Sequence, residues 1–262
     1  MINMKYLIAI DSDGTIRHSD GTISTRAKKV IKELIKKDNI IVICTARPRY
    51  HTLEISKKAG IDKYLISSNG TEVFDNSRNK VIYSAYLPKD KCKKIYKDSL
   101  KNNIRIMFVT DNTEYVTQFT RNNSQVLLND NNIDELLSKK IKQIMIIGKE
   151  KEKITYFQKE IEKKYKLKII DVSNDLNSES WFSIISNKAS KGIALKKLAE
   201  YLDIPIENTI AIGNDKNDIS MFDIAGLSVA VSNASSDVKK VADNITLSND
   251  EDGVAIFLES LL

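Results

Sequence analysis

The sequence predicts an α/β protein with a Rossmann-like core, built on a parallel sheet and interrupted by an inserted α+β domain. Strand-length apolar runs alternate with amphipathic helical patterns over residues 1–84, and the same alternation returns after residue 186. The section between them mixes short strands and helices in no regular alternation. We therefore expect a discontinuous core of residues 1–84 and 186–262 and a separate domain of residues 85–185.

The first core segment alternates strand and helix from its beginning. Lys5–Ile10 is a near-continuous apolar run, which is typical of a strand covered on both faces. Ser24–Lys37 places its apolar residues on one helical stripe, with lysines opposite. Strict alternation implies right-handed crossovers and therefore parallel strands. The other elements expected here are the strands Ile40–Cys44 and Tyr64–Ile66, the helix Arg49–Ala59 ended by Gly60, and a hairpin within Thr71–Ser84.

The inserted section is expected to contain elements of several lengths. Its Asn-rich stretches near residues 122–132 and 174–177 are typical of loops. The expected helices are Lys89–Lys101, Ile133–Leu137 and Lys151–Tyr165, and the expected strands are Ile104–Val109, Tyr115–Thr117, Lys142–Ile147, Leu167–Asp171 and Trp181–Ser186.

The second core segment restores the first pattern. In such a core, the loops at the carboxyl ends of the strands surround a binding crevice, so polar residues in those loops are the candidates for function. The expected helices are Lys191–Tyr201, Asp218–Ile224, Asp237–Val241 and Val254–Leu261, and the expected strands are Thr209–Ile212, Leu227–Val231 and Asn244–Leu247.

Composition argues against a membrane protein or a nucleic-acid-binding protein. Apolar stretches in the 262 residues are only strand-length. The formal charge of +6 comes from lysines that alternate with apolar positions, as in KKVIKELIKK, a pattern typical of a solvated helix face. Cys44 and Cys92 have no metal-ligand or disulfide spacing, and the N-terminus lacks signal-peptide features. We expect a cytoplasmic monomer or homodimer that binds small anions but no nucleic acid and no membrane.

Two carboxylates follow the first strand, in the segment Asp11-Ser12-Asp13-Gly14-Thr15. Residues two apart in an extended chain point to the same side, so both carboxylates are expected to face one reacting centre. Gly14 permits a tight turn that Thr15 can hold by a local hydrogen bond. The alternative is an ordinary solvated turn, which uses the same residue types.

Three further polar segments occupy matching places. Thr45 and Arg47 follow a strand and offer a hydroxyl and a guanidinium to a phosphate, although a helix cap and a surface arginine are the simpler alternative. Lys191 begins a helix, where a cation opposes the helix dipole unless an anion compensates it. The segment Gly213-Asn214-Asp215-Lys216-Asn217-Asp218 carries oxygen ligands suited to Mg²⁺, or a capping loop. Together the segments supply a nucleophile, an acid/base and positive charge for phosphoryl transfer.

These motifs resemble those of the haloacid dehalogenase superfamily of phosphatases, and within it the Cof-type sugar-phosphatase branch with a C2-type cap. The fourth motif of the family, GDxxND, is replaced here by residues 213–218, and the resemblance spans nearly the whole chain. The other matching segments are DxDGT at Asp11–Thr15, the second motif at Thr45-Ala46-Arg47, SNG at Ser68-Asn69-Gly70, and the lysine motif at Lys191-Gly192.

The resemblance implies a Mg²⁺-dependent phosphatase that hydrolyses a small phosphate ester, such as a sugar phosphate, through an aspartyl-phosphate. It implies that Asp11 is the nucleophile and that Asp13 protonates the leaving oxygen and then activates water. The Asp11 carboxylate and the Asp13 carbonyl would bind Mg²⁺, and Thr45 and Lys191 would hold the phosphoryl oxygens. Residues 85–185 would form the cap. The implied substrate-binding residues are Thr45, Ala46, Arg47, Lys191 and Asn217.

Two positions depart from the family pattern. Ala46 stands in place of a glycine, and Asn214 stands in place of the first metal-binding aspartate of the fourth motif. An amide oxygen can bind Mg²⁺ but carries no full charge, so Asp215 is an alternative ligand, with Asp218 as a further acid. Two other functions stay open at this stage: a phosphomutase or phosphotransferase of the same superfamily, and a regulator that binds phosphate ligands without turnover.

Overall fold

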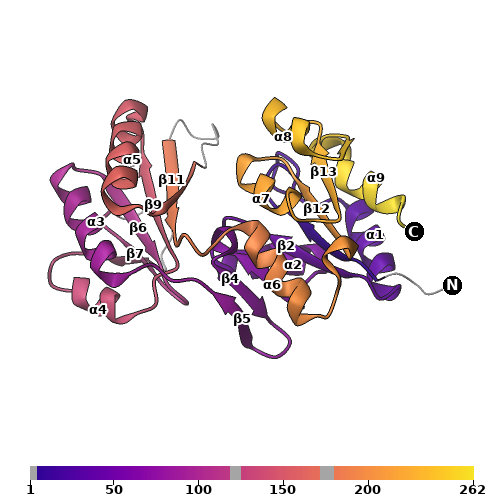
Figure 1. The fold of residues 1–262 in the computed structure, drawn as a ribbon, viewed down its shortest axis with the longest axis horizontal. Helices are drawn as coiled ribbons and strands as arrows, with labels where there is room; N and C mark the ends of the chain where they lie inside the picture. The colour runs from indigo at the N-terminus through magenta and orange to yellow at the C-terminus, as the bar shows by residue number, and fades with distance from the viewer. Residues whose placement is uncertain (1–4, 119–124, 172–179) are drawn as a thin grey trace. The chain divides into compact units, whose positions relative to one another are not determined.

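The structure is a computed structural model that describes residues 5–118, 125–171 and 180–262 (Figure 1). The chain divides into two compact units: Met1–Ser84 with Ala189–Leu262, and Ala85–Lys188. The predicted loop near residues 174–177 lies outside the described residues. Within the described part of the chain, no helix has the length and apolar character needed to cross a bilayer.

The first unit is built on an eight-stranded sheet with the order β14-β13-β12-β1-β2-β3-β4-β5. The strands from β14 to β3 are parallel, and the β4–β5 hairpin extends the sheet with antiparallel pairing. The predicted parallel sheet is therefore confirmed, with the hairpin added at one edge. The strands are β1 (Leu7–Ile10), β2 (Ile40–Cys44), β3 (Tyr64–Ser67), β4 (Glu72–Asp75), β5 (Lys80–Ser84), β12 (Thr209–Gly213), β13 (Leu227–Val231) and β14 (Asn244–Thr246).

Helices cover both faces of this sheet, which confirms the α/β prediction (Figure 1). Because both faces are covered, the central strand β1 is apolar throughout and its four residues are fully buried. One face carries α1 (Thr25–Lys36), α2 (Arg49–Ala59) and α9 (Gly253–Glu259), and the other carries α6 (Lys191–Tyr201), α7 (Ile219–Phe222) and α8 (Ser236–Val241).

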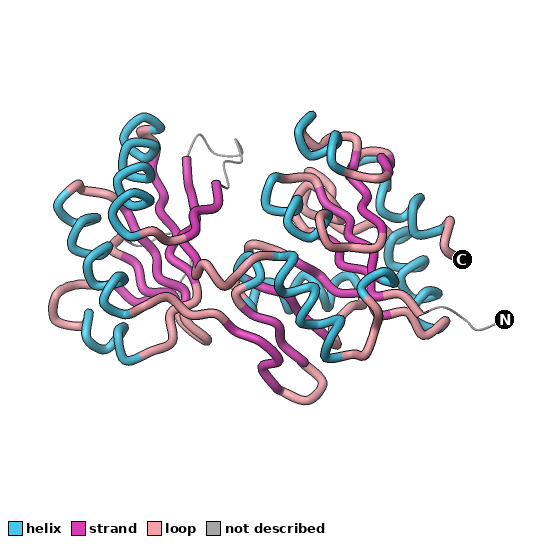
Figure 2. Tube along the Cα trace, viewed as in Figure 1, coloured by secondary structure: helices cyan, strands magenta, loops and turns pink. Residues whose placement is uncertain are grey.

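The second unit has its own sheet, in the order β10-β11-β9-β6-β7-β8. Its helices gather along one face, as Figure 2 shows, and the apolar side chains between helices and sheet form a separate core. The pairs are antiparallel except for β7 with β8. The elements are α3 (Lys89–Lys101), β6 (Arg105–Val109), β7 (Glu114–Val116), β8 (Gln125–Leu127), α4 (Ile133–Ser138), β9 (Gln143–Gly148), α5 (Lys151–Tyr165), β10 (Lys168–Asp171) and β11 (Ser180–Ile185).

Two elements differ from their prediction. Strand β8 lies in the Asn-rich stretch predicted as a loop, because it is formed by parallel pairing with β7 rather than by a local apolar pattern. The predicted helix Asp218–Ile224 is a short 3₁₀ turn, Lys216–Asp218, followed by α7. Asp215 and Asp218 form a capping box, which starts the helical turn earlier than the apolar periodicity indicates.

Candidate active site

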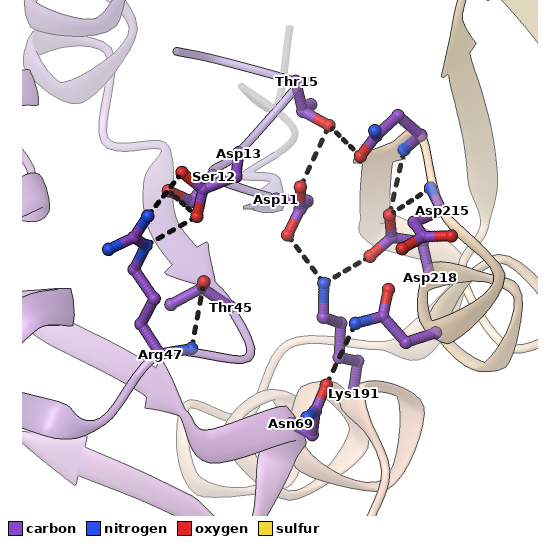
Figure 3. A network of polar contacts seen from close by, with 12 residues as sticks. Asp11, Ser12, Asp13, Thr15, Thr45, Arg47, Asn69, Lys191, Asp215 and Asp218 are labelled. Carbon is purple, nitrogen blue, oxygen red and sulfur yellow. Dashed lines mark hydrogen bonds and ion pairs between the residues drawn. The ribbon is translucent and has the colours of Figure 1, made fainter. Parts of the chain in front are cut away.

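The polar segments singled out in the sequence meet at the carboxyl-terminal edge of the parallel sheet (Figure 3). Asp11 directly follows β1, and its backbone N–H donates to the carbonyl of Ile212 in β12 at 2.9 Å. Thr45 directly follows β2, and the loop from Asn214 to Asp218 directly follows β12. Parallel pairing brings these strand ends together, so the convergence is a consequence of topology.

Lys191 lies at the centre of the site. Its Nζ donates to Asp11 Oδ1 at 2.7 Å and to Asp218 Oδ1 at 2.5 Å, and only 1% of its side chain is exposed. These carboxylates are the anions that compensate a cation at the start of α6. Burial alone would lower the pKa of Lys191, but the two carboxylates outweigh burial and hold that pKa above its ordinary value.

The first turn of α6 is fixed on both sides of Lys191. The Ser190 hydroxyl caps the helix by accepting from the Ile193 backbone N–H at 3.0 Å. Gly192 lies so close to the neighbouring α7 that a Cβ there would come within 1.8 Å of the Ser220 carbonyl oxygen. The Lys191 side chain is therefore presented from a rigid helix start.

Asp11 is almost fully buried and has a second partner. The Thr15 hydroxyl donates to Asp11 Oδ2 at 3.1 Å, on the opposite side of the carboxylate from Lys191 (Figure 3). Burial raises the pKa of Asp11 to about 7; the negative charges of Asp218 and Asp13 add to this rise, and Lys191 opposes it. An additional cation beside Asp11 would favour the ionised carboxylate.

Asp13 has different partners from Asp11. Arg47 forms a two-point contact with it, Nε to Oδ2 at 2.6 Å and Nη2 to Oδ1 at 2.9 Å, and Arg17 also donates to Oδ1. Burial would raise the pKa of Asp13, but the two guanidinium groups outweigh burial and hold that pKa below its ordinary value. The Asp13 carboxylate is thus paired with two arginines, whereas the Asp11 carboxylate is paired with Lys191.

Arg17 was not among the residues predicted from sequence. It is positioned by its own loop, because its Nε donates to the Gly21 carbonyl at 3.1 Å and its backbone carbonyl accepts from Asn249 at 3.0 Å. The only signal in the sequence is an arginine four residues after Asp13, which is indistinguishable from a surface arginine without the fold.

The second motif is buried at Thr45 and more open after it. Thr45 is 1% exposed, and its hydroxyl accepts from the Arg47 backbone N–H at 3.3 Å. Ala46 lies partly exposed in the bend between them. The SNG segment stabilises this bend through two backbone hydrogen bonds. The N–H of Ser68 donates to the Arg47 carbonyl at 2.8 Å, and the N–H of Asn69 donates to the Thr45 carbonyl at 3.0 Å.

The SNG segment is a left-handed turn that joins the second motif to the lysine helix. Ser68, Asn69 and Gly70 all have positive φ, at 50°, 58° and 79°. A Cβ on Gly70 would lie 2.1 Å from the Ser190 carbonyl oxygen, so only glycine fits there. Asn217 also contacts this turn, with Nδ2 donating to Asn69 Oδ1 at 3.0 Å.

The two acids of the fourth motif support the loop itself. Asp218 Oδ2 accepts from the backbone N–H groups of Asn214 and Asp215, both at 2.9 Å, while its other oxygen accepts from Lys191. The Asp215 carboxylate accepts from the Lys216 backbone N–H at 2.7 Å. Across the described ranges, no three His, Cys, Asp or Glu side chains are grouped so that they could hold a metal ion.

The Asn214 amide lies against Asp11, Asp13 and Thr15. In one orientation its Oδ1 accepts from the Thr15 hydroxyl at 2.9 Å. Turned over, its Nδ2 donates to that hydroxyl at 2.9 Å, to the Asp13 carbonyl at 3.2 Å and to Asp11 Oδ2 at 3.2 Å. Of the residues predicted as metal ligands, Asn214 thus lies beside both the Asp11 carboxylate and the Asp13 carbonyl.

Comparison with known proteins identifies the family. A family model described as haloacid dehalogenase-like hydrolase matches residues 8–258. The phosphatase YwpJ of Bacillus subtilis (strain 168) is 30% identical, with 98% of this chain and 99% of that protein covered. The 5-amino-6-(5-phospho-D-ribitylamino)uracil phosphatase YcsE of the same organism is 30% identical, with 95% of this chain and 92% of that protein covered.

Solved structures show the same fold. A haloacid dehalogenase-like hydrolase from B. subtilis has a TM-score of 0.81 at 28% identity, covering 98% of this chain and 100% of that chain. The HAD subclass IIB sugar phosphatase BT4131 has a TM-score of 0.83 at 21% identity, covering 98% of this chain and 100% of that chain.

The fold and the match of the family model define the class: the chain belongs to the haloacid dehalogenase-like hydrolases. Its curated relatives are named phosphatases, which supports a phosphoric monoester hydrolase. The resemblance noted in the sequence is confirmed at the level of family, fold and enzyme class.

Proposed function

We propose that this protein is a Mg²⁺-dependent phosphatase that hydrolyses a small phosphorylated metabolite of the sugar-phosphate type through an aspartyl-phosphate. The observation that carries the proposal is the buried Asp11 carboxylate, held 2.7 Å from Lys191 at the end of β1. The names of two relatives support the substrate class, because BT4131 is described as a sugar phosphatase and YcsE acts on a phosphorylated ribityl compound.

The residues present fit a magnesium ion. Mg²⁺ prefers oxygen ligands at about 2.1 Å in octahedral geometry, which places neighbouring ligands about 3.0 Å apart. The side-chain atom that Asn214 turns toward the site lies 3.2 Å from both Asp11 Oδ2 and the Asp13 carbonyl. We therefore assign the ligand position to Asn214 rather than Asp215, with Asp218 behind it. When bound, the ion would reduce the charge repulsion between Asp11 and an anionic phosphate.

Asp11 is the nucleophile in this proposal. A carboxylate oxygen of Asp11 forms a bond to phosphorus while the bond from phosphorus to the ester oxygen breaks. Asp13, once it has taken up a proton from solvent, transfers that proton to the leaving oxygen. It then takes a proton from the water that attacks the aspartyl-phosphate, which releases phosphate and restores Asp11. Lys191 and the Thr45 hydroxyl hold the phosphoryl oxygens, and Lys191 also fixes the position of Asp11.

Asp13 can act as an acid only if Arg47 gives up part of its contact. In the described conformation Arg47 and Arg17 keep Asp13 ionised. A phosphate ester is a competing partner for a guanidinium, because planar arginine binds phosphate and carboxylate in the same two-point manner. We propose that the phosphate of the substrate replaces Asp13 as the partner of Arg47. We also propose that Ala46 and Asn217 contact the substrate.

The unit of residues 85–188 is assigned the role of the cap. A cap that closes over a phosphatase core excludes water and contacts the leaving group. Both described cysteines, Cys44 and Cys92, are free and buried, which agrees with a reducing compartment. We place the enzyme in the cytoplasm, as a monomer or homodimer.

A phosphate-release screen over many phosphorylated metabolites tests the proposal. The purified protein is assayed with Mg²⁺ and again with excess chelator. We expect release from at least one small ester with Mg²⁺ and none with chelator. Product isomers with little net phosphate would indicate a mutase instead, and binding of esters without release would indicate a regulator.

A further inference from the structure

We infer that the Asn214 amide is a metal-responsive switch: its NH₂ group holds the site together without Mg²⁺, and its carbonyl oxygen turns inward when Mg²⁺ binds. This inference rests on the magnesium site of the proposed function. It concerns the residue that departs from the family pattern and gives that departure a physical role.

The amide-inward orientation satisfies the metal-free site. Nδ2 then reaches Asp11 Oδ2 and the Asp13 carbonyl, both at 3.2 Å. Both atoms are hydrogen-bond acceptors, and they are the same two atoms that would share a cation. A donor between them supplies protons where the ion would supply positive charge.

The Thr15 hydroxyl distinguishes the two orientations. It lies 3.1 Å from Asp11 Oδ2 and 2.9 Å from the nearer atom of the Asn214 amide. With nitrogen inward, the hydroxyl donates to Asp11 and accepts from Asn214, so every group has a partner. When Asp11 is ionised and the amide oxygen is inward, one hydroxyl proton faces two acceptors, and three oxygens converge without a donor between them. Such an arrangement of buried acceptors is unfavourable unless a cation is present.

The surrounding chain restricts the change to the amide. The Asn214 backbone N–H is fixed by Asp218 Oδ2 at 2.9 Å. On the other side, Gly14 leaves room for the side chain, since a Cβ there would lie 2.6 Å from the amide atom that points away from Asp11. A half-turn about the last side-chain bond exchanges nitrogen and oxygen with little change of volume.

An aspartate at this position would behave differently. It has no N–H to donate, and it would add a negative charge beside Asp11, whose nearest cation, Lys191, is already shared with Asp218. Without metal, this repulsion lowers stability. With metal, a full charge on the ligand increases affinity. Compared with an aspartate, Asn214 therefore makes the metal-free protein more stable and makes its affinity for Mg²⁺ lower.

The test compares the full-length wild type with Asn214→Asp, and with Asn244→Asp as a control that makes the same change at an exposed site. Calorimetric titration of the chelator-treated proteins with Mg²⁺ alone is expected to show affinity at least about tenfold higher in Asn214→Asp, because ligand charge tunes affinity. Its metal-free thermal midpoint is expected to lie below those of the wild type and the control. Equal Mg²⁺ affinity in all three proteins, or an unchanged metal-free midpoint, would overturn the inference.

A second measurement needs only the wild type. The side-chain amide protons of Asn214, assigned by NMR through their own residue, are expected to exchange slowly without metal. On Mg²⁺ addition they should shift and exchange faster, because they lose their acceptors. No change at saturating Mg²⁺ would contradict the switch.

Phosphate release is scored separately. If the wild type releases phosphate from no ester but shows the expected Mg²⁺ affinities and amide changes, the proposed function is rejected and the switch is supported. If the wild type releases phosphate but the affinity and amide effects are absent, the proposed function is supported and the switch is rejected.

Discussion

Lys191 is the residue on which the charge balance of the site depends. It is a single buried cation between two buried carboxylates, Asp11 and Asp218. Removing one partner from such a group leaves charge in a medium that solvates it poorly, which costs far more than losing a surface ion pair. The same side chain holds Asp11, the proposed nucleophile, so we expect stability and activity to be coupled at this position.

We predict that Lys191→Met lowers the free energy of unfolding by about 3–5 kcal/mol, the usual cost of breaking a buried ion pair. Phosphate release should fall by at least about a hundredfold, as when one preorganised charge-stabilising group is removed. Urea unfolding and steady-state assays measure the two effects. Lys196→Met, at an exposed position of the same helix, is the control and should change neither quantity much. Activity near that of the wild type would contradict the role assigned to Lys191.

The sequence predicts which segments converge at the site, but it does not predict the direction of every side chain there. Asp11 and the loop after β12 were predicted to converge because parallel strands share one carboxyl-terminal edge, and Lys191 was predicted to join them because it begins a neighbouring helix. The two-residue spacing led us to expect Asp13 to face the same centre as Asp11. The structure turns Asp13 to Arg47 and Arg17, a contact between distant segments that local spacing does not encode.

The SNG turn and the start of α6 pack together at Gly70. Gly70 and Gly60 both have φ of +75° to +79°, so both positions are strained for any other residue. They differ in surroundings: a Cβ on Gly60 meets nothing within 4 Å, whereas one on Gly70 meets the Ser190 backbone. Alanine variants at these two positions therefore distinguish the cost of backbone strain from the cost of a steric clash.

We predict that Gly60→Ala costs about 1–2 kcal/mol, from the left-handed backbone alone. Gly70→Ala should cost about 1–3 kcal/mol more, because the backbone before Lys191 must move. Thermal or urea unfolding measures both, and phosphate release should fall only in Gly70→Ala. Equal stability losses in the two variants would show that the contact with Ser190 has no energetic weight.

Elements with complete local signals were predicted closely. The bounds of α2, α3, α5 and α6 agree with the prediction, because apolar periodicity and end signals such as Gly60 and Ser190 define them locally. Strand β8 was missed because three residues carry no detectable period, and its pairing with β7 is a tertiary contact. The 3₁₀ turn before α7 was missed because its capping box also has the composition of a metal-binding loop.

The whole molecule consists of two units with separate hydrophobic cores. The core of the second unit includes Ile95, Phe108, Ile144 and Phe157, all of which come from residues 85–188. Asp11, the proposed nucleophile, and Lys191 both belong to the first unit. The core of the second unit therefore contains no residue of the site.

We predict that residues 85–188 expressed alone unfold in one cooperative transition and release no phosphate from any ester. A unit of this size buries enough apolar surface to be stable by itself. Circular dichroism against temperature measures the transition. A segment without a cooperative transition would show that its core depends on the rest of the chain.

If Asp11 attacks phosphorus, as we propose, Asp11→Asn must lose phosphate release. The substitution removes the nucleophile with little change in volume, so we predict a loss of at least about a thousandfold, as for other enzymes that lose a nucleophile. Circular dichroism should show the wild-type fold. A correctly folded Asp11→Asn protein that releases phosphate at the wild-type rate would show that Asp11 is not the nucleophile.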